Sequence, residues 1–71
     1  MPTIRVELFE GRTPEQKAAL AREITDACVR VLGGSAGGVD VVFHDIRRHD
    51  WATRGVLWSD MPPPPPPPRA G

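Results

Sequence analysis

The residue with the clearest chemical potential is Pro2, which directly follows the initiator Met1. Initiator methionine is normally removed when the next residue is small, so we expect a chain that begins with the secondary amine of Pro2. An apolar surround lowers the pKa of such an amine because it disfavours the cation. A neutral amine can accept a proton. The sequence therefore predicts a site for general acid–base proton transfer at the amino end of the chain.

The histidines and the cysteine do not indicate a metal site. The pairs His44-Asp45 and His49-Asp50 lie outside the expected helix, so their spacing places them on no common helical face. The chain has one cysteine, which excludes an intramolecular disulfide. We therefore expect no metal and no stabilising cross-link.

Two strands are expected to position the amino end. Residues 3–9 alternate between polar and apolar side chains, which predicts a strand with one buried face. Residues 39–46 include consecutive apolar side chains at 41–43, which predict a second strand buried on both faces. Residues 55–58 predict a short third strand or hairpin.

A helix is expected between the two strands. Thr13 suits an N-cap, Pro14 suits the first helical position, and Gln16 completes the spacing of a capping box. Apolar side chains then recur at helical spacing until Gly33-Gly34, which favours a helix end. Strand, helix and strand in this order predict an α+β fold, a single βαβ unit with two parallel strands.

The length of the chain predicts an oligomer. A chain of 71 residues forms one small domain that is marginally stable alone. A two-stranded parallel sheet covered by one helix leaves its other face open, and such a face needs a partner. We therefore expect several copies of this chain to assemble.

Charge and hydropathy limit the other partners. Nine Lys and Arg residues balance nine Asp and Glu residues, so no basic surface for nucleic acid or an anionic membrane is expected. No apolar run approaches the ~20 residues of a membrane span. The amino end lacks the regions of a signal peptide, which predicts a cytoplasmic protein.

A run of seven prolines, Pro62 to Pro68, separates a tail from the rest of the chain. Consecutive prolines favour an extended polyproline II rod and exclude helix and sheet. We therefore expect a folded domain at residues 1–60 and a disordered, proline-rich tail at 61–71. The tail is either a solvated extension or a ligand for an aromatic-lined groove.

The motifs together resemble the 4-oxalocrotonate tautomerase family. The resemblance rests on the proline after methionine, the turn that follows the first strand, the helix start and the last segment before the tail. These are Met1-Pro2-Thr3-Ile4, Glu10-Gly11-Arg12, Glu15-Gln16-Lys17, Gly55-Val56-Leu57 and Ser59-Asp60. The resemblance implies a βαβ protomer, a hexamer built as a trimer of dimers, no cofactor, and an isomerase that moves a proton within a small carboxylate-bearing substrate.

The resemblance also implies site residues. Pro2 corresponds to the catalytic amino-terminal proline, Arg12 to an arginine that binds a substrate carboxylate, and Trp51 to an aromatic residue that keeps the pocket apolar. A guanidinium suits bidentate carboxylate binding. Trp51 could instead be an ordinary packing or interface residue, and Arg12 a solvated turn residue.

Asp40 departs from the family pattern, because the family's dicarboxylate isomerase has a second arginine there. A carboxylate cannot hold a second substrate carboxylate. Asp40 could instead activate water, which makes a hydratase, dehalogenase or decarboxylase using Pro2 and Asp40 the alternative enzyme; it could also be only a turn residue. A third hypothesis is a non-catalytic oligomeric module that displays polyproline tails.

Overall fold

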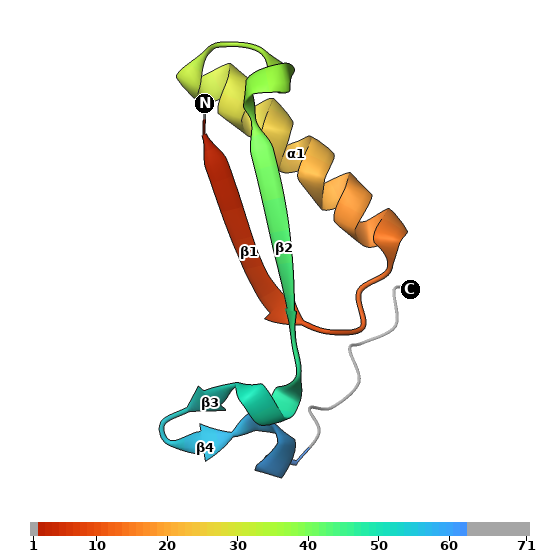
Figure 1. Ribbon diagram of the computed structural model, residues 1–71, viewed down its shortest axis with the longest axis vertical. Coiled ribbons are helices and arrows are strands. Elements are labelled where there is room, and N and C mark those ends of the chain that lie inside the picture. Colours follow the sequence, from red (N-terminus) through yellow and green to blue (C-terminus); the bar gives the residue numbers. More distant parts are fainter. Residues whose placement is uncertain (1, 63–71) are drawn as a thin grey trace, which may run out of the picture.

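Two parallel strands and one helix form the frame of the molecule (Figure 1). The computed structural model describes residues 2–62, and the predicted tail beyond Pro62 lies outside them. The frame consists of β1 (Thr3–Phe9), α1 (Pro14–Leu32) and β2 (Asp40–Ile46). β1 and β2 pair in parallel over their whole length, from Thr3 opposite Asp40 to Phe9 opposite Ile46. The predicted α+β class and the single βαβ unit are confirmed.

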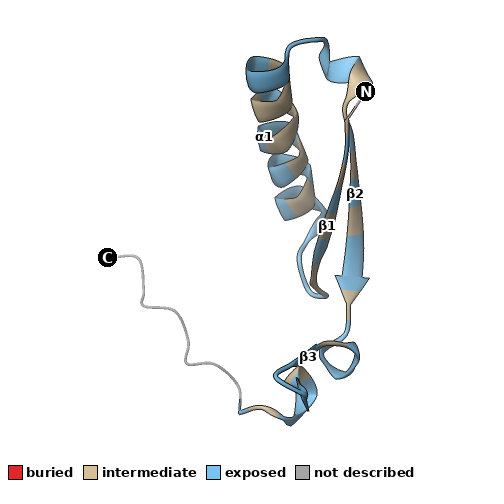
Figure 2. Cartoon of the chain, turned by 90° about the vertical axis from the view of Figure 1, so that its left-hand side faces the viewer, coloured by how far each residue is buried: buried red, intermediate tan, exposed pale blue. Residues whose placement is uncertain are grey.

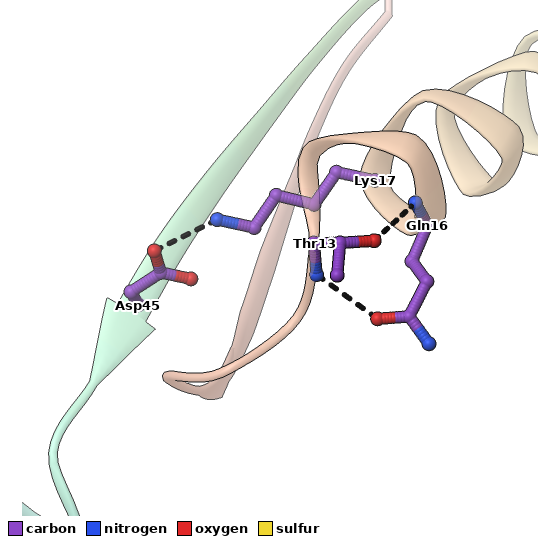
Figure 3. A network of polar contacts seen from close by, with 4 residues as sticks. All are labelled: Thr13, Gln16, Lys17 and Asp45. Atoms are coloured by element: carbon purple, nitrogen blue, oxygen red, sulfur yellow. Dashed lines mark hydrogen bonds and ion pairs between the residues drawn. The ribbon is translucent and has the colours of Figure 1, made fainter.

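The start of α1 is the predicted capping box (Figure 3). The backbone N–H of Gln16 donates to Thr13 Oγ1 at 3.1 Å, and the backbone N–H of Thr13 donates to Gln16 Oε1 at 2.9 Å. Pro14 lacks an N–H and has none to satisfy at the first helical position. At the other end of the helix, Gly33 has a φ of 83°. A residue with a side chain would be strained in this conformation.

Replacing Thr13 with alanine should therefore destabilise the helix start. The alanine variant loses the acceptor for the Gln16 N–H, and we expect a loss of about 1 kcal/mol in the free energy of unfolding. Chemical unfolding at fixed protein concentration measures the difference. Thr13→Ser keeps the hydroxyl and should retain the stability; equal losses in both variants would show that the cap is not the cause.

The helix covers one face of the sheet (Figure 2). Parallel register places the alternate residues of β1 and their partners on β2 on a common face, and the apolar residues of that face are half-buried. They are Ile4, Val6, Leu8, Val41 and Phe43. Lys17 of α1 reaches Asp45 on the same face, with Nζ 2.7 Å from Oδ2 (Figure 3). This ion pair shows that the face lies under the helix.

The opposite face of the sheet is open in a single chain. Val42 lies on it and is 40% exposed, so the expectation that the second strand is buried on both faces is not met within one protomer. No residue of the described part, 2–62, is fully buried (Figure 2). A fold of this size normally buries several apolar side chains. The missing burial agrees with the predicted assembly.

A small lobe follows β2. It contains one hairpin and two short 3₁₀ turns: η2 (Arg48–Asp50), β3 (Ala52–Thr53), β4 (Val56–Leu57) and η3 (Trp58–Asp60). β3 and β4 pair antiparallel, which confirms the predicted C-terminal hairpin. The sequence located only its second strand, because β3 has two residues and no alternating pattern.

Three aromatic rings fix the lobe to the carboxyl end of β1. The ring centroid of Phe9 lies 4.7 Å from that of Trp51 and 5.2 Å from that of Trp58, both tilted. The indole N–H of Trp58 donates to Thr53 Oγ1 at 2.8 Å. The guanidinium carbon of Arg48 lies 4.8 Å from the centroid of the Phe9 ring. Such tilted pairs and a cation over a ring are favourable, so this aromatic cluster (Phe9, Trp51 and Trp58) orients the hairpin.

Among residues 2–62, no helix combines the length and apolar character that crossing a membrane requires.

Candidate active site

Pro2 borders a small hollow at the amino ends of the two strands. The hollow has a volume of about 190 Å³ and is lined otherwise by the loop between α1 and β2. Its lining residues are Pro2, Gly33, Gly34, Ser35, Gly38 and Val39. None of these side chains carries a charge. The lining therefore places no charged side chain in the hollow beside Pro2.

The glycine loop is the part of this hollow that sequence reasoning missed. Gly33 and Gly34 have φ of 83° and 89°, which side chains rarely adopt, and an added Cβ at either position would meet no atom within 4 Å. A side chain at either position is therefore disfavoured by the backbone conformation rather than by packing. The signal was available, because parallel strands start at the same edge of a sheet. A glycine-rich segment before the second strand must lie beside the residue before the first.

Asp40 is brought next to Pro2 by the strand register. It is the first residue of β2, it pairs with Thr3, and its backbone N–H donates to the carbonyl of Pro2 at 3.0 Å. Asp40 is exposed, and its carboxylate makes no hydrogen bond or ion pair within the part of the chain that the structure describes. An acidic residue is thus bonded, through its backbone, to the residue that is predicted to act as a base.

Arg12 lies at the other end of β1. With Leu8, Gln16, Lys17 and Leu20 it lines a hollow of about 210 Å³ between the turn and the start of α1. Lys17 is engaged by Asp45, whereas Arg12 is exposed and forms no ion pair with any of residues 2–62. Its guanidinium is therefore available to an anion from outside the chain.

Trp51 also lies at that far end. It belongs to the aromatic cluster and lines a separate hollow of about 380 Å³ with Glu7, Ile46, Asp50 and Ala52. The turn after β1 is joined to the end of β2 by a hydrogen bond of 3.0 Å from the N–H of Glu10 to the carbonyl of Ile46. Arg12 and Trp51 are thus both placed at the carboxyl ends of the strands.

One chain does not bring the predicted site residues together. The seven residues of β1 separate Pro2 from the turn that holds Arg12, and an extended strand of that length spans about 23 Å. Figure 1 shows the amino end beside the last turn of α1 and the hairpin beyond the opposite end of the sheet. A site that contains Pro2, Arg12 and Trp51 needs a second chain.

Within residues 2–62 no three His, Cys, Asp or Glu side chains are grouped as metal ligands are. His49 Nε2 lies 3.5 Å from Asp50 Oδ2, so these two consecutive residues of the lobe contact each other. The predicted site residues at the amino ends of the strands are Pro2 and Asp40.

Comparisons with known proteins extend along almost the whole described chain. The family model described as "Tautomerase enzyme" matches residues 2–61. A probable tautomerase of Ralstonia nicotianae is 42% identical over 62 residues, which cover 87% of this chain and 95% of that protein. A solved 4-oxalocrotonate tautomerase homologue is 41% identical, with a TM-score of 0.80 over 89% of this chain and 100% of that one. A heterohexameric 4-oxalocrotonate tautomerase from Chloroflexus aurantiacus is 26% identical, with a TM-score of 0.81 over 87% and 100%.

Proposed function

Since this chain belongs to the 4-oxalocrotonate tautomerase family, we propose that it moves a proton within a small enol, keto acid or unsaturated acid that carries a carboxylate. The family match confirms the resemblance carried by Pro2 and the Glu10-Gly11-Arg12 turn. The observation that carries the finer proposal is the hollow beside Pro2, which has an uncharged lining.

The proposed reaction is an internal transfer of one proton. The neutral amine of Pro2 takes a proton from an enol oxygen or an acidic carbon, and the resulting ammonium returns a proton to another carbon of the same molecule. The double bond shifts, and the substrate gains and loses no electrons. The net change is an isomerisation with no oxidation or reduction, so the proposed chemistry needs no redox cofactor.

The binding part of the site would come from a partner subunit. β1 pairs only with β2 in the described sheet, so its other edge is free for a second copy. A two-fold axis through Val6, the middle residue of β1, would pair two such edges antiparallel. Pro2 would then lie opposite Glu10 of the partner subunit, two residues before the partner subunit's Arg12. This arrangement supports Arg12 as the anchor for the substrate carboxylate.

The exposed surfaces that remain support a larger assembly. The open face of the sheet, with Val42, is unchanged by pairing at the β1 edge. This face could form a second interface, and we propose a homohexamer of three such dimers. The heterohexameric Chloroflexus protein has a similar fold and supports this assembly.

The proposal is tested by turnover of enolised phenylpyruvate, a monocarboxylate enol. We expect the purified chain to accelerate ketonisation, and a variant that ends at Met61 to do so equally. Mass spectrometry of the same sample should show that Met1 has been removed. Retained Met1 would leave no amine on Pro2 and would overturn the mechanism.

The rival hypotheses give different results in the same assay. A non-catalytic module that displays polyproline tails would turn over no enol. A hydratase, dehalogenase or decarboxylase that uses Asp40 would consume an unsaturated acid or haloacid, and Asp40→Asn would abolish that activity alone.

A further inference from the structure

Asp40 raises a chemical problem for a base at Pro2. A carboxylate near an amine stabilises the ammonium form, and so works against the neutral amine that accepts a proton. Asp40 is adjacent to Pro2 through the strand register, and no cation within residues 2–62 pairs with its carboxylate. A positive charge from outside the chain would remove the conflict.

Arg54 is a cation in an unusual position. Arg54 and Gly55 form the two-residue connection between β3 and β4, with φ of 57° and 79°. Two left-handed residues are typical of a type I′ turn, which favours asparagine, aspartate or glycine at its first position. Arg54 is the one residue other than glycine in the described chain with a positive φ. Local backbone preference therefore does not explain why arginine stands there.

The side chain of Arg54 is also free. It is exposed, and it forms no hydrogen bond or ion pair with another described residue. Arg48, by contrast, lies over the Phe9 ring. The hydrogen bond from the Trp58 indole N–H to Thr53 Oγ1 holds the hairpin that carries Arg54. The position of the hairpin tip is therefore fixed relative to the lobe. Strained residues persist where the surrounding structure holds them, and they often serve a function.

The position of the hairpin decides which group its tip can meet. The hairpin and Arg12 both lie at the carboxyl ends of the strands, whereas Pro2 and Asp40 lie at the amino ends (Figure 1). Any partner that brings its Arg12 to Pro2 also brings its hairpin towards the same edge. Arg54 of the partner subunit would then be a second unpaired cation at the interface, beside the partner subunit's Arg12, and Asp40 an unpaired anion there.

We propose that Arg54 of one subunit forms an ion pair with Asp40 of another, beside the amine of Pro2. This inference rests on the composite site of the proposed function. The pair offsets the charge of Asp40 and ties the hairpin to the neighbouring subunit. It also leaves the Arg12 guanidinium as the cation for substrate, so the site accepts one carboxylate and disfavours dicarboxylates.

Charge reversal tests the pair. Asp40→Arg and Arg54→Asp are each expected to lower kcat/KM for enolised phenylpyruvate about tenfold, a coupling typical of interacting charges, and to weaken assembly. The double variant restores the opposite charges, and should recover kcat/KM to within about threefold and the assembled mass. Arg47→Asp combined with Asp40→Arg is the matched control. It reverses another exposed arginine of the lobe and should rescue nothing.

The assembled mass, measured by light scattering, separates this inference from the reaction itself. If the unaltered protein turns over no enol, the proposed function fails, yet assembly must still be lost in the single variants and regained in the double. If the loss of kcat/KM and of assembly in the double variant equals the sum of the losses in the two single variants, the two residues do not interact and no such pair exists.

A variant without backbone strain at position 54 tests whether the effects of Arg54→Asp come from misfolding of the turn. Arg54→Asn suits the left-handed position and removes the charge, so its stability as a fold should not fall. We expect it to lower kcat/KM and weaken assembly as Arg54→Asp does, to a smaller extent. Unchanged kcat/KM and unchanged assembly in Arg54→Asn would overturn the proposal.

Discussion

Replacing Pro2 with alanine is expected to lower kcat for enolised phenylpyruvate about 10²–10⁴-fold, the usual contribution of a general base. Alanine is also small, so Met1 should still be removed and an amine should still end the chain. That amine is primary and rotates freely, whereas the pyrrolidine ring of Pro2 fixes the direction of its nitrogen beside the hollow. Steady-state kinetics of the fully assembled variant measure the decrease in kcat.

The matched control is Pro14→Ala. It makes the same chemical change at the first residue of α1, where proline mainly favours the helix start. This variant should keep kcat close to that of the unaltered protein. An unchanged kcat in Pro2→Ala, or an equal loss in both variants, would remove Pro2 from the mechanism.

The second large effect is expected at Arg12. Arg12→Ala removes a charge-assisted, bidentate contact, and we expect a loss of about 1.5–3 kcal/mol in transition-state binding, on the order of 10- to 150-fold in kcat/KM. The loss should appear with carboxylate-bearing enols. An uncharged enol should be turned over as before, because it offers no anion to the guanidinium.

Arg22→Ala is the control for Arg12. Arg22 is an exposed arginine on α1, and its removal takes away one positive charge without touching the turn after β1. It should leave both substrates unaffected. Equal losses on charged and uncharged enols in Arg12→Ala would indicate that Arg12 supports the structure of the turn rather than the substrate.

Local sequence rules predicted the frame of the fold. Thr13 and Gln16 form the capping box because its two hydrogen bonds depend only on residues three apart. The alternation in residues 3–9 likewise reflects a local period of two. The start of the second strand was predicted one residue early, because the N–H of Val39 donates to Ala36 in a preceding 3₁₀ turn.

Features that depend on distant contacts could not be predicted in this way. Phe9 ends β1 and packs in tilted ring pairs with Trp51 and Trp58. That cluster joins residues more than forty positions apart, and no spacing rule brings them together. The left-handed conformation of Arg54 was equally hidden, since arginine gives no turn signal.

The candidate site was predictable residue by residue but not as a geometry. Family resemblance supplied Pro2, Arg12 and Trp51 as members of one pocket, and their roles stay predictions. The parallel register places Pro2 beside Asp40 and separates it from Arg12 by the length of β1. Only contacts between chains can close that gap, and a single sequence does not encode their orientation in any local pattern.

The aromatic cluster has a spectroscopic consequence. Trp51 and Trp58 are the two tryptophans of the chain, which has no tyrosine, and both lie against Phe9 at the carboxyl ends of the strands. Intrinsic emission excited at long wavelength therefore originates almost wholly from this lobe. A ligand that binds beside Pro2 could quench that emission directly only if another subunit's indoles approach it. Fluorescence titration of a dissociated protein should then be silent, and the signal should appear as subunits associate.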